Sequence, residues 1–305
     1  MLDRLHGPIE GGDPRLPGGL RLLKMHLHVH RVEVYEPLLY WFFRLQGPKY
    51  PAQAGPKQER KDLMSENGLS LDLNGQIALI TGAASGLGAA TARVFAKHGA
   101  RVICGDIDEK GAQEVAEAIG GRALYLDVAE PTSAEATVHE ILDSEGRIDI
   151  LVNNAGVDFI RSVTEMSLAE WDRVQHVNLR APWLLSRTVF PHMIERGSGQ
   201  IVNVSSTASK KGWSNASAYA ASKHGVMGLT QALHAEGKEH GVKVMAVVAG
   251  GMRTNFFRTL DPPPPPENLQ PPENVAACIL FMVCQPAESI IHELIVTPMT
   301  ETSYP

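Results

Sequence analysis

The sequence predicts an α/β fold in which a doubly wound parallel sheet of about seven strands carries helices on both faces. An apolar run, Gln76 to Ile80, leads directly into a glycine-rich turn, residues 81–88 (TGAASGLG), and then into a segment with helical spacing. The next apolar run ends in an acid, Asp106, roughly twenty residues after the turn. Apolar runs and amphipathic segments then alternate along the chain, and this alternation is typical of a parallel sheet covered by helices.

The glycine-rich turn is the first functional signal. Its glycines stand at the spacing G-x-x-x-G-x-G rather than G-x-G-x-x-G. Gly82 would permit a tight turn, Gly86 would let the backbone approach a pyrophosphate, and Gly88 would let the helix pack against the strand. A strand, a glycine-rich turn and a helix in this order predict a dinucleotide-binding site.

Asp106 ends the strand that follows, residues 101–106 (RVICGD). A carboxylate at this position can accept hydrogen bonds from both ribose hydroxyls of an adenosine and would repel a 2′-phosphate. No Arg or Lys lies inside the glycine turn, and the first one after Asp106 is Lys110. The pattern favours NAD over NADP, with the alternative that Asp106 only caps a helix beginning at Asp108.

Tyr219 and Lys223 stand four residues apart, and Ser206 lies thirteen residues before the tyrosine. Residues four apart share one face of a helix, so the phenol and the ammonium can converge on one point. Ser206 would end the apolar strand 200–206, at the edge of an open α/β sheet where ligands bind. The three groups predict a proton-transfer site for an alcohol or a ketone. The alternative is an ordinary amphipathic helix with a half-buried tyrosine and a solvated lysine.

The other elements follow in chain order. Helices are predicted over 108–120, 132–146, 167–197 (one long helix, kinked near Pro182), 218–240 and 274–285, and strands over 147–156, 242–251 and 293–298. Between the last two helices, residues 256–272 contain five consecutive prolines, which favour a stiff polyproline extension and exclude a long helix. This segment is either a rigid substrate lid, with Phe256 and Phe257 as apolar contacts, or a surface connection.

Taken together, these motifs resemble the short-chain dehydrogenase/reductase family in its single-domain form, including 3-oxoacyl-ACP reductase-like enzymes and short-chain alcohol dehydrogenases. The resemblance covers roughly residues 71–298 and implies a Rossmann-type sheet. It rests on eight motifs in family order: TGAASGLG (81–88), Asp106, LDV (126–128), NNAG (153–156), VNL (177–179), IVNVSS (201–206), YAASK (219–223) and AGGMRT (249–254).

The resemblance implies a role for each matching residue. Tyr219 would exchange a proton with the substrate oxygen, and Ser206 would donate a hydrogen bond to it, with the Ser205 side chain on the other face. Lys223 would hold the nicotinamide ribose and lower the pKa of the phenol, and Asn178 would hold a water that links the lysine to solvent. No metal is implied. The implied cofactor-binding residues are Gly82, Ser85, Gly86, Leu87, Gly88, Asp106, Ile107, Asp127, Val128, Asn154, Ala155, Gly156, Tyr219, Lys223, Gly250 and Thr254.

One position departs from the family pattern. Ala249 stands before Gly250 where the family usually has proline. An alanine restores a backbone N–H and frees one φ angle. We expect a modest effect on cofactor affinity rather than loss of function.

The composition agrees with an enzyme whose domain has one large core. The chain has 305 residues, 44% of them hydrophobic, and a net charge of −6, which argues against nucleic acid as a partner. Three cysteines without metal-ligand spacing suggest a reducing, cytoplasmic compartment, and no apolar run is long enough to span a membrane. The resemblance also implies a homodimer or homotetramer built on the helices over 167–197 and 218–240.

Residues 1–70 differ from the rest. They are rich in proline, glycine and basic residues and show no pattern that predicts a domain. We expect an N-terminal extension, residues 1–70, followed by a catalytic domain over residues 71–305. Met64 is the expected natural start, because the segment from Met64 to Gly82 resembles the usual opening of the family.

The leading functional hypothesis is an NAD(H)-dependent oxidoreductase that interconverts a secondary alcohol and a ketone, with 3-oxoacyl thioesters as one candidate substrate. The alternatives are an NADP-dependent reductase of the same family and a non-catalytic scaffold that senses NAD. Lys210 and Lys211 would attract an anionic substrate or a carrier protein, or would otherwise be solvated loop residues.

Overall fold

The computed structural model describes residues 64–65, 68–257 and 263–301. Most of the expected N-terminal extension, residues 1–63, lies outside the described residues, as do residues 258–262 of the expected lid. Before the main body, β1 (Met64–Ser65) pairs antiparallel with β2 (Gly68–Leu69).

The body of the protein is built on a parallel sheet of seven strands, in the order β5-β4-β3-β6-β7-β8-β9. The strands are β3 (Ile77–Thr81), β4 (Arg101–Asp106), β5 (Arg122–Tyr125), β6 (Ile150–Asn153), β7 (Gly199–Ser206), β8 (Val242–Ala249) and β9 (Glu293–Val296). The chain winds outward from β3 in one direction and from β6 in the other. The strand order therefore reverses between β3 and β6, where open α/β sheets bind ligands.

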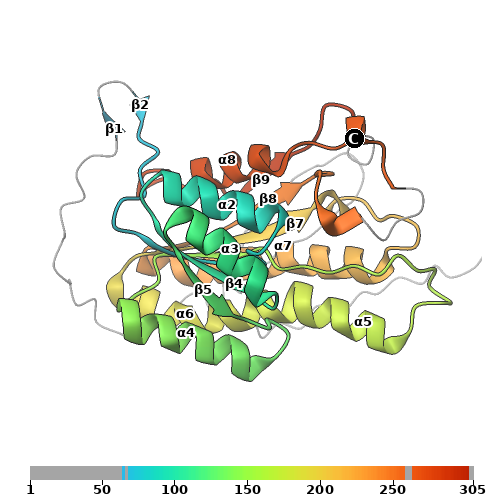
Figure 1. The fold of residues 1–305 in the computed structure, drawn as a ribbon, viewed down its shortest axis with the longest axis horizontal. Helices are drawn as coiled ribbons and strands as arrows, with labels where there is room; N and C mark the ends of the chain where they lie inside the picture. Colours follow the sequence, from blue (N-terminus) through green and yellow to red (C-terminus); the bar gives the residue numbers. More distant parts are fainter. Residues whose placement is uncertain (1–63, 66–67, 258–262, 302–305) are drawn as a thin grey trace, which may run out of the picture. The chain divides into compact units, whose positions relative to one another are not determined.

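Helices cover both faces of the sheet, as Figure 1 shows, and each face has its own hydrophobic core. One layer is formed by α2 (Gly86–Lys97), α3 (Glu109–Ile119) and α8 (Pro272–Val283). The other is formed by α4 (Pro131–Glu145), α5 (Leu168–Gln175), α6 (Ala181–Arg196) and α7 (Ser217–Gly237). The predicted doubly wound fold is confirmed.

The helix ends follow from local sequence. Ser167 and Glu170 form a capping box at the start of α5, and the Asp108 carboxylate accepts from the Gly111 N–H at the start of α3. Gly120, Gly146 and Gly197 end α3, α4 and α6 in the left-handed conformation that favours glycine.

The long helix predicted over 167–197 is divided by a π-helical turn, His176–Arg180, between α5 and α6. The irregularity expected near Pro182 therefore comes immediately before that proline. Pro182 has no N–H to donate to the carbonyl four residues earlier, so the regular bonding pattern cannot continue through this position. The turn contains Asn178, and such π turns occur often at functional sites.

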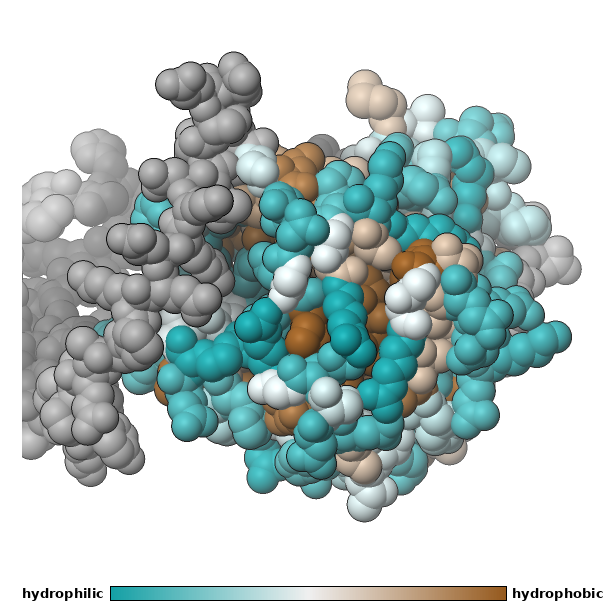
Figure 2. Space-filling model, turned by 60° about the vertical axis from the view of Figure 1, so that its left-hand side comes forward, coloured by the Kyte–Doolittle hydropathy of each residue, from teal (hydrophilic) through white to brown (hydrophobic). Residues whose placement is uncertain are grey.

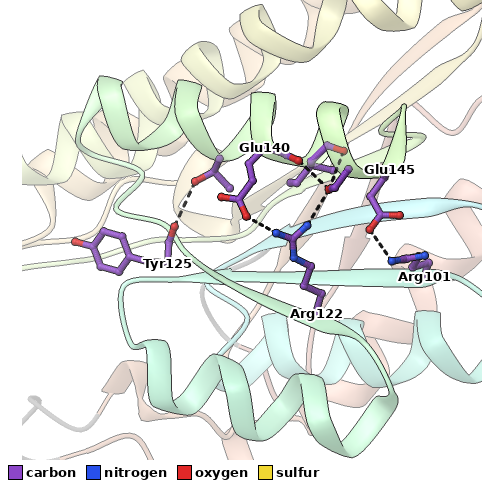
Figure 3. Close-up of polar contacts among 8 residues, drawn as sticks. Arg101, Arg122, Tyr125, Glu140 and Glu145 are labelled. Atoms are coloured by element: carbon purple, nitrogen blue, oxygen red, sulfur yellow. Dashed lines mark hydrogen bonds and ion pairs between the residues drawn. The ribbon is translucent and has the colours of Figure 1, made fainter.

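Polar contacts fasten α4 to the edge of the sheet (Figure 3). The Arg122 guanidinium on β5 contacts the Glu140 carboxylate and donates to the Ser144 hydroxyl at 2.8 Å. At β4, Arg101 pairs with Glu145 at 2.8 Å. An exposed ion pair contributes about 1 kcal/mol or less to stability. The Arg122–Glu140 pair is of this kind, whereas the Glu145 side chain, which pairs with Arg101, is buried.

Hydrophilic side chains cover most of the described surface on the side shown in Figure 2, with hydrophobic side chains in small patches between them. Within the described part of the chain, no helix is long and apolar enough to cross a bilayer.

Candidate functional site

The glycine turn joins β3 to α2 at the point where the strand order reverses. Gly82 has φ 68°, and a Cβ added there would lie 2.9 Å from Ala155 Cα. A Cβ on Gly88 would lie 2.0 Å from the Gly82 carbonyl oxygen, so only glycine lets α2 begin this close to the turn. Gly86, with φ 55°, is the first residue of α2. Its backbone N–H belongs to the helix N-terminus, the part of a helix that attracts phosphate.

Asn154 ties the end of β6 to this turn. Its side-chain amide donates to the carbonyl oxygens of Thr81 at 2.9 Å and of Gly82 at 3.2 Å. The Thr81 hydroxyl in turn accepts from the backbone N–H groups of Asn154 and Ala155, both at 3.0 Å. The turn and the NNAG segment thus form one hydrogen-bonded unit.

Asp106, the last residue of β4, presents its carboxylate to the same region. One oxygen accepts from the Ala84 N–H and the other from the Asp108 N–H, both at 2.9 Å. Asp108, not Asp106, accepts from the first turn of α3. The alternative that Asp106 is only a helix cap is therefore wrong. Each of its oxygens retains a further lone pair for a ligand.

Tyr219 and Ser206 meet at the carboxyl end of β7. Their side chains are neighbours, and both residues are buried, with 8% and 7% of their surfaces exposed. The lid residue Phe256 packs on the tyrosine, with 5.7 Å between ring centroids. Burial raises the pKa of Tyr219 above its usual value, and the neighbouring Ser206 hydroxyl acts in the opposite direction. In this structure burial thus outweighs the lowering of the tyrosine pKa that the sequence suggested.

Lys223 lies one helical turn beyond Tyr219 on α7. Its ammonium donates to the Val204 carbonyl at 2.9 Å and lies 5.6 Å from the centre of the Tyr219 ring. Burial lowers the pKa of Lys223 to about 8, and the charge of Asp158 acts in the opposite direction. The Ser205 hydroxyl donates to the Lys223 backbone carbonyl at 3.3 Å, away from Ser206, as strand alternation predicts.

Asn178 lies in the π turn and holds the neighbouring backbone. Its side-chain oxygen accepts from the Val157 N–H, and its amide donates to the Val157 carbonyl, both at 2.9 Å. The amide also lies 3.2 Å from the Ser222 hydroxyl on α7. Asn178 therefore fixes the segment after NNAG relative to the helix that carries Tyr219 and Lys223.

The buried lysine predicts a dependence of stability on pH. The folded pKa of Lys223, about 8, is below the ordinary value of 10.5, so the unfolded chain binds more protons between these limits. The free energy of unfolding should therefore rise with pH through this window. Between roughly pH 8 and 10, we expect the free energy of unfolding of the wild type to rise by about 2 kcal/mol relative to that of Lys223→Met. Urea denaturation of both proteins across that range measures the difference. If the free energies of the two proteins changed with pH in the same way, the burial of a titrating ammonium would be contradicted.

These groups surround one cavity of about 840 Å³. It is lined by every residue expected at the cofactor except Gly88, and by Ser206. Asn178 is not among the lining residues and touches the site through Val157. Phe256, Phe257 and Pro264 also line the cavity, which favours the lid interpretation of the proline-rich segment over a surface connection.

Arg173 and Glu301 are charged lining residues that were not expected from the sequence. Arg173 on α5 lies 3.8 Å from the Asp127 carboxylate, and Glu301 approaches the Gly251 N–H at 3.2 Å. Neither stands in a recognisable motif. The departure at Ala249 is accommodated within the sheet, because Ala249 ends β8 and is paired with Ser206 and with Val296.

Comparison with known proteins agrees with this geometry. The family model for short chain dehydrogenases matches residues 76–264. D-threitol dehydrogenase from Mycolicibacterium smegmatis is 41% identical over 180 residues, covering 57% of this chain and 69% of that protein.

Two solved structures are similar over almost their whole length. A metagenomic short-chain oxidoreductase in complex with NADP is 34% identical, with TM-score 0.66, covering 75% of this chain and 99% of that one. The 3-ketoacyl-(acyl-carrier-protein) reductase from Brucella melitensis complexed with NADH is 32% identical, with TM-score 0.70 and the same coverage. Fold, motifs and comparisons agree: the chain belongs to the short-chain dehydrogenase family and is an oxidoreductase of the kind that binds a nicotinamide cofactor.

Proposed function

We propose that this enzyme uses NAD(H) to interconvert a secondary alcohol and a ketone. The observation that carries the proposal is that the buried side chains of Tyr219 and Ser206, with the Lys223 ammonium beside the tyrosine ring, line one cavity that also contains the glycine turn. A site that only bound a nucleotide would not need a phenol, a hydroxyl and an ammonium at one point, which speaks against a non-catalytic scaffold.

The residues present fit a nicotinamide dinucleotide. The glycine turn leaves no side chain between backbone and cavity at Gly82 and Gly86, and the N-terminus of α2 lines the cavity, where it would bind a pyrophosphate. Asp106 would hold the adenosine ribose, and Lys223 the nicotinamide ribose. When bound, the cofactor supplies hydride acceptance or donation.

The protein's own groups would manage the proton. As the phenolate, Tyr219 would take the proton from the alcohol during oxidation, and as the phenol it would give a proton to the ketone oxygen during reduction. Ser206 would orient the substrate oxygen, and the charge on Lys223 would favour the phenolate. Because burial and the negative charge of Asp158 both raise the pKa of Tyr219, a neighbouring cation is needed for Tyr219 to act as a base near neutral pH.

Asp106 supports NAD rather than NADP as the cofactor. Its carboxylate is fixed by two backbone N–H groups, and its remaining lone pairs suit the two ribose hydroxyls. A 2′-phosphate would bring like charges together, which costs several kcal/mol. Relatives with NADP and with NADH both exist in this family, so this residue is the basis of the assignment.

Replacing Asp106 tests the assignment. The wild type should use NAD with a kcat/KM on the order of 100-fold above that for NADP. Asp106→Ser should lower the value for NAD about tenfold and raise that for NADP, because both the hydrogen bonds and the repulsion are lost. Asp172→Ser, at an exposed position, is the control. A wild type that prefers NADPH would contradict the proposal.

The substrate is a neutral carbonyl compound or its alcohol. The Lys210 ammonium, a candidate for attracting an anion, instead donates to the Glu293 carboxylate at 2.8 Å. The two reactions suggested by the relatives are oxidation of a polyol and reduction of a 3-oxoacyl thioester. A screen of both classes, following the absorbance of the reduced nicotinamide, tests the proposal, and turnover of neither would overturn it.

We also propose that the enzyme is a homodimer or homotetramer of the cytoplasm. Trp183 on α6 is 45% exposed, with Arg187 placed 5.8 Å from the centre of its ring, and the face it occupies would suit a second copy. The three cysteines are unpaired, which suits a reducing compartment. Light scattering of the purified protein tests the assembly.

A further inference from the structure

Asp158 is an acidic residue in the active-site region to which neither the family motifs nor the proposed chemistry gives a role. The backbone that leads into it is fixed, because Asn178 accepts from the N–H and donates to the carbonyl of Val157. Three residues later, the Arg161 N–H donates to the Asn215 carbonyl at 2.9 Å. This bond places the segment that begins at Asp158 beside the loop that contains Trp213.

The carboxylate of Asp158 is incompletely satisfied. Its Oδ1 atom is buried and has no hydrogen-bond partner in the described part of the chain. A buried acceptor without a partner costs about 1 to 3 kcal/mol, and native proteins retain such groups mainly where a ligand, a water or a reaction uses them. The folded protein therefore carries an acceptor that its own residues do not use.

Asp158 also lies within electrostatic reach of the catalytic pair. Its negative charge raises the pKa of Tyr219 and the pKa of Lys223. Burial raises the pKa of Asp158 itself to about 6, against the Phe159 N–H and the Lys223 charge, which lower it. Asp158 is not itself among the residues that line the cavity, but it directly follows Val157, which is, and its carboxyl group is ionised at neutral pH.

Trp213 supplies a complementary donor. Its indole packs in one cluster with Ala208, Ala216 and Tyr219, and the residue lines the cavity. Its Nε1 atom is likewise buried without a partner among the described residues. The loop is held in a demanding shape, because Asn215 has φ 63°, unlike any other non-glycine residue that the structure describes.

We infer that Asp158 determines substrate specificity by accepting a hydrogen bond from a second hydroxyl of the substrate, next to the reacting carbinol, with Trp213 donating to the same group. A hydroxyl can donate and accept at once, so one group can satisfy both unused atoms. The substrate class is then a vicinal diol or hydroxyketone, as in a polyol. A 3-oxoacyl thioester has no donor beside its ketone and would leave the carboxylate unpaired. The inference rests on the proposed alcohol–ketone chemistry and restricts the proposed substrates to those with a second hydroxyl beside the reacting carbon.

The test compares two alcohols that differ in one hydroxyl, butane-2,3-diol and butan-2-ol, with NAD. The wild type should have a kcat/KM for the diol about 10- to 100-fold above that for the mono-alcohol, the range expected for a hydrogen bond to a charged group. Asp158→Asn should reduce this ratio about tenfold or more. The kcat/KM values for both alcohols will change in Asp158→Asn, because the charge of Asp158 also acts on Tyr219. Since that effect is the same for both alcohols, the ratio of the two values reports only the recognition of the second hydroxyl.

A pH series adds a signature that a merely structural role would lack. In the wild type the ratio should fall as the pH drops through about 6, where the Asp158 carboxylate takes up a proton. In Asp158→Asn the ratio should not change with pH. Trp213→Phe keeps an aromatic ring but removes the indole N–H, and it should lower the ratio by a smaller factor. Glu165→Gln, which changes an exposed acid on the same segment, serves as the control.

Binding measured without turnover separates this inference from the proposed function. Isothermal titration of the NADH-loaded wild type should show tighter binding of the diol than of the mono-alcohol, and Asp158→Asn should lose that difference. Diol-selective binding without oxidation would overturn only the proposed chemistry. Oxidation of both alcohols with a ratio that Asp158→Asn leaves unchanged would overturn the role of Asp158, whatever Trp213→Phe does.

Discussion

Replacing Tyr219 by Phe should lower kcat about 1,000-fold while changing cofactor affinity little. The substitution removes one oxygen atom from a ring that is already buried and packed against Phe256, so the fold should be retained. A positioned group that transfers a proton in the transition state contributes roughly 10²- to 10⁴-fold to the rate. Steady-state kinetics with the best substrate of the screen, together with NADH titration by fluorescence, measures both quantities.

Tyr125→Phe is the matched control. Tyr125 is 49% exposed on β5, and its backbone carbonyl, not its phenol, accepts from Thr137. Figure 3 shows its ring pointing away from the cluster of polar contacts. The same chemical change there should leave kcat near the wild-type value. If Tyr219→Phe turned over as fast as Tyr125→Phe, another group would have to carry the proton.

The second large effect is expected at the glycine turn. Gly88→Ala places a methyl group 2.0 Å from the Gly82 carbonyl oxygen and 2.7 Å from the Asn154 side-chain amide. Neither can retreat easily, because Asn154 itself holds the Thr81 and Gly82 carbonyls. The start of α2 must move away from the turn, and overpacking of this kind costs about 3 kcal/mol or slightly less. Thermal denaturation should show the loss, and NADH affinity should fall with it.

Gly228→Ala controls for the general effect of exchanging glycine for alanine in a helix. Gly228 lies inside α7, and an added Cβ would meet nothing within 4 Å. Alanine is favoured over glycine in a helix interior by about 1 kcal/mol or slightly less, so this variant should be more stable than the wild type. Two variants of equal stability would show that the close contact at Gly88 is not real.

Much of the fold could be predicted because its signals are local. The apolar runs that became β3, β4, β7 and β8 are buried on both faces, so they are almost continuous in sequence. The glycines of the turn are required by backbone geometry at their own positions. Strand β5 (Arg122–Tyr125) carries no such signal, because it is a partly buried edge strand, and only the LDV motif just after it could be recognised.

The parts that could not be predicted depend on contacts between distant segments. That Lys210 is neutralised by Glu293, 83 positions away, follows from the pairing of β8 with β9 and not from any local pattern. The polar atoms left unpaired at Asp158 and Trp213 can be identified only when every neighbour is known. The pKa of Tyr219 could not be predicted for the same reason, because it depends on the balance between burial and neighbouring charges, which residue spacing does not reveal.

The π turn at His176–Arg180 limits where residues can be inserted into or deleted from this protein. Successive residues of an α-helix are rotated by about 100°, so a wider turn acts as one inserted residue that resets the rotation of everything beyond it. Deleting a residue here would remove the extra residue that the wider turn contains. Either Asn178 would then swing away from Val157 or the apolar side of α6 would leave the sheet. Variation in chain length should therefore be tolerated in the loops on either side of this helix pair but not between them.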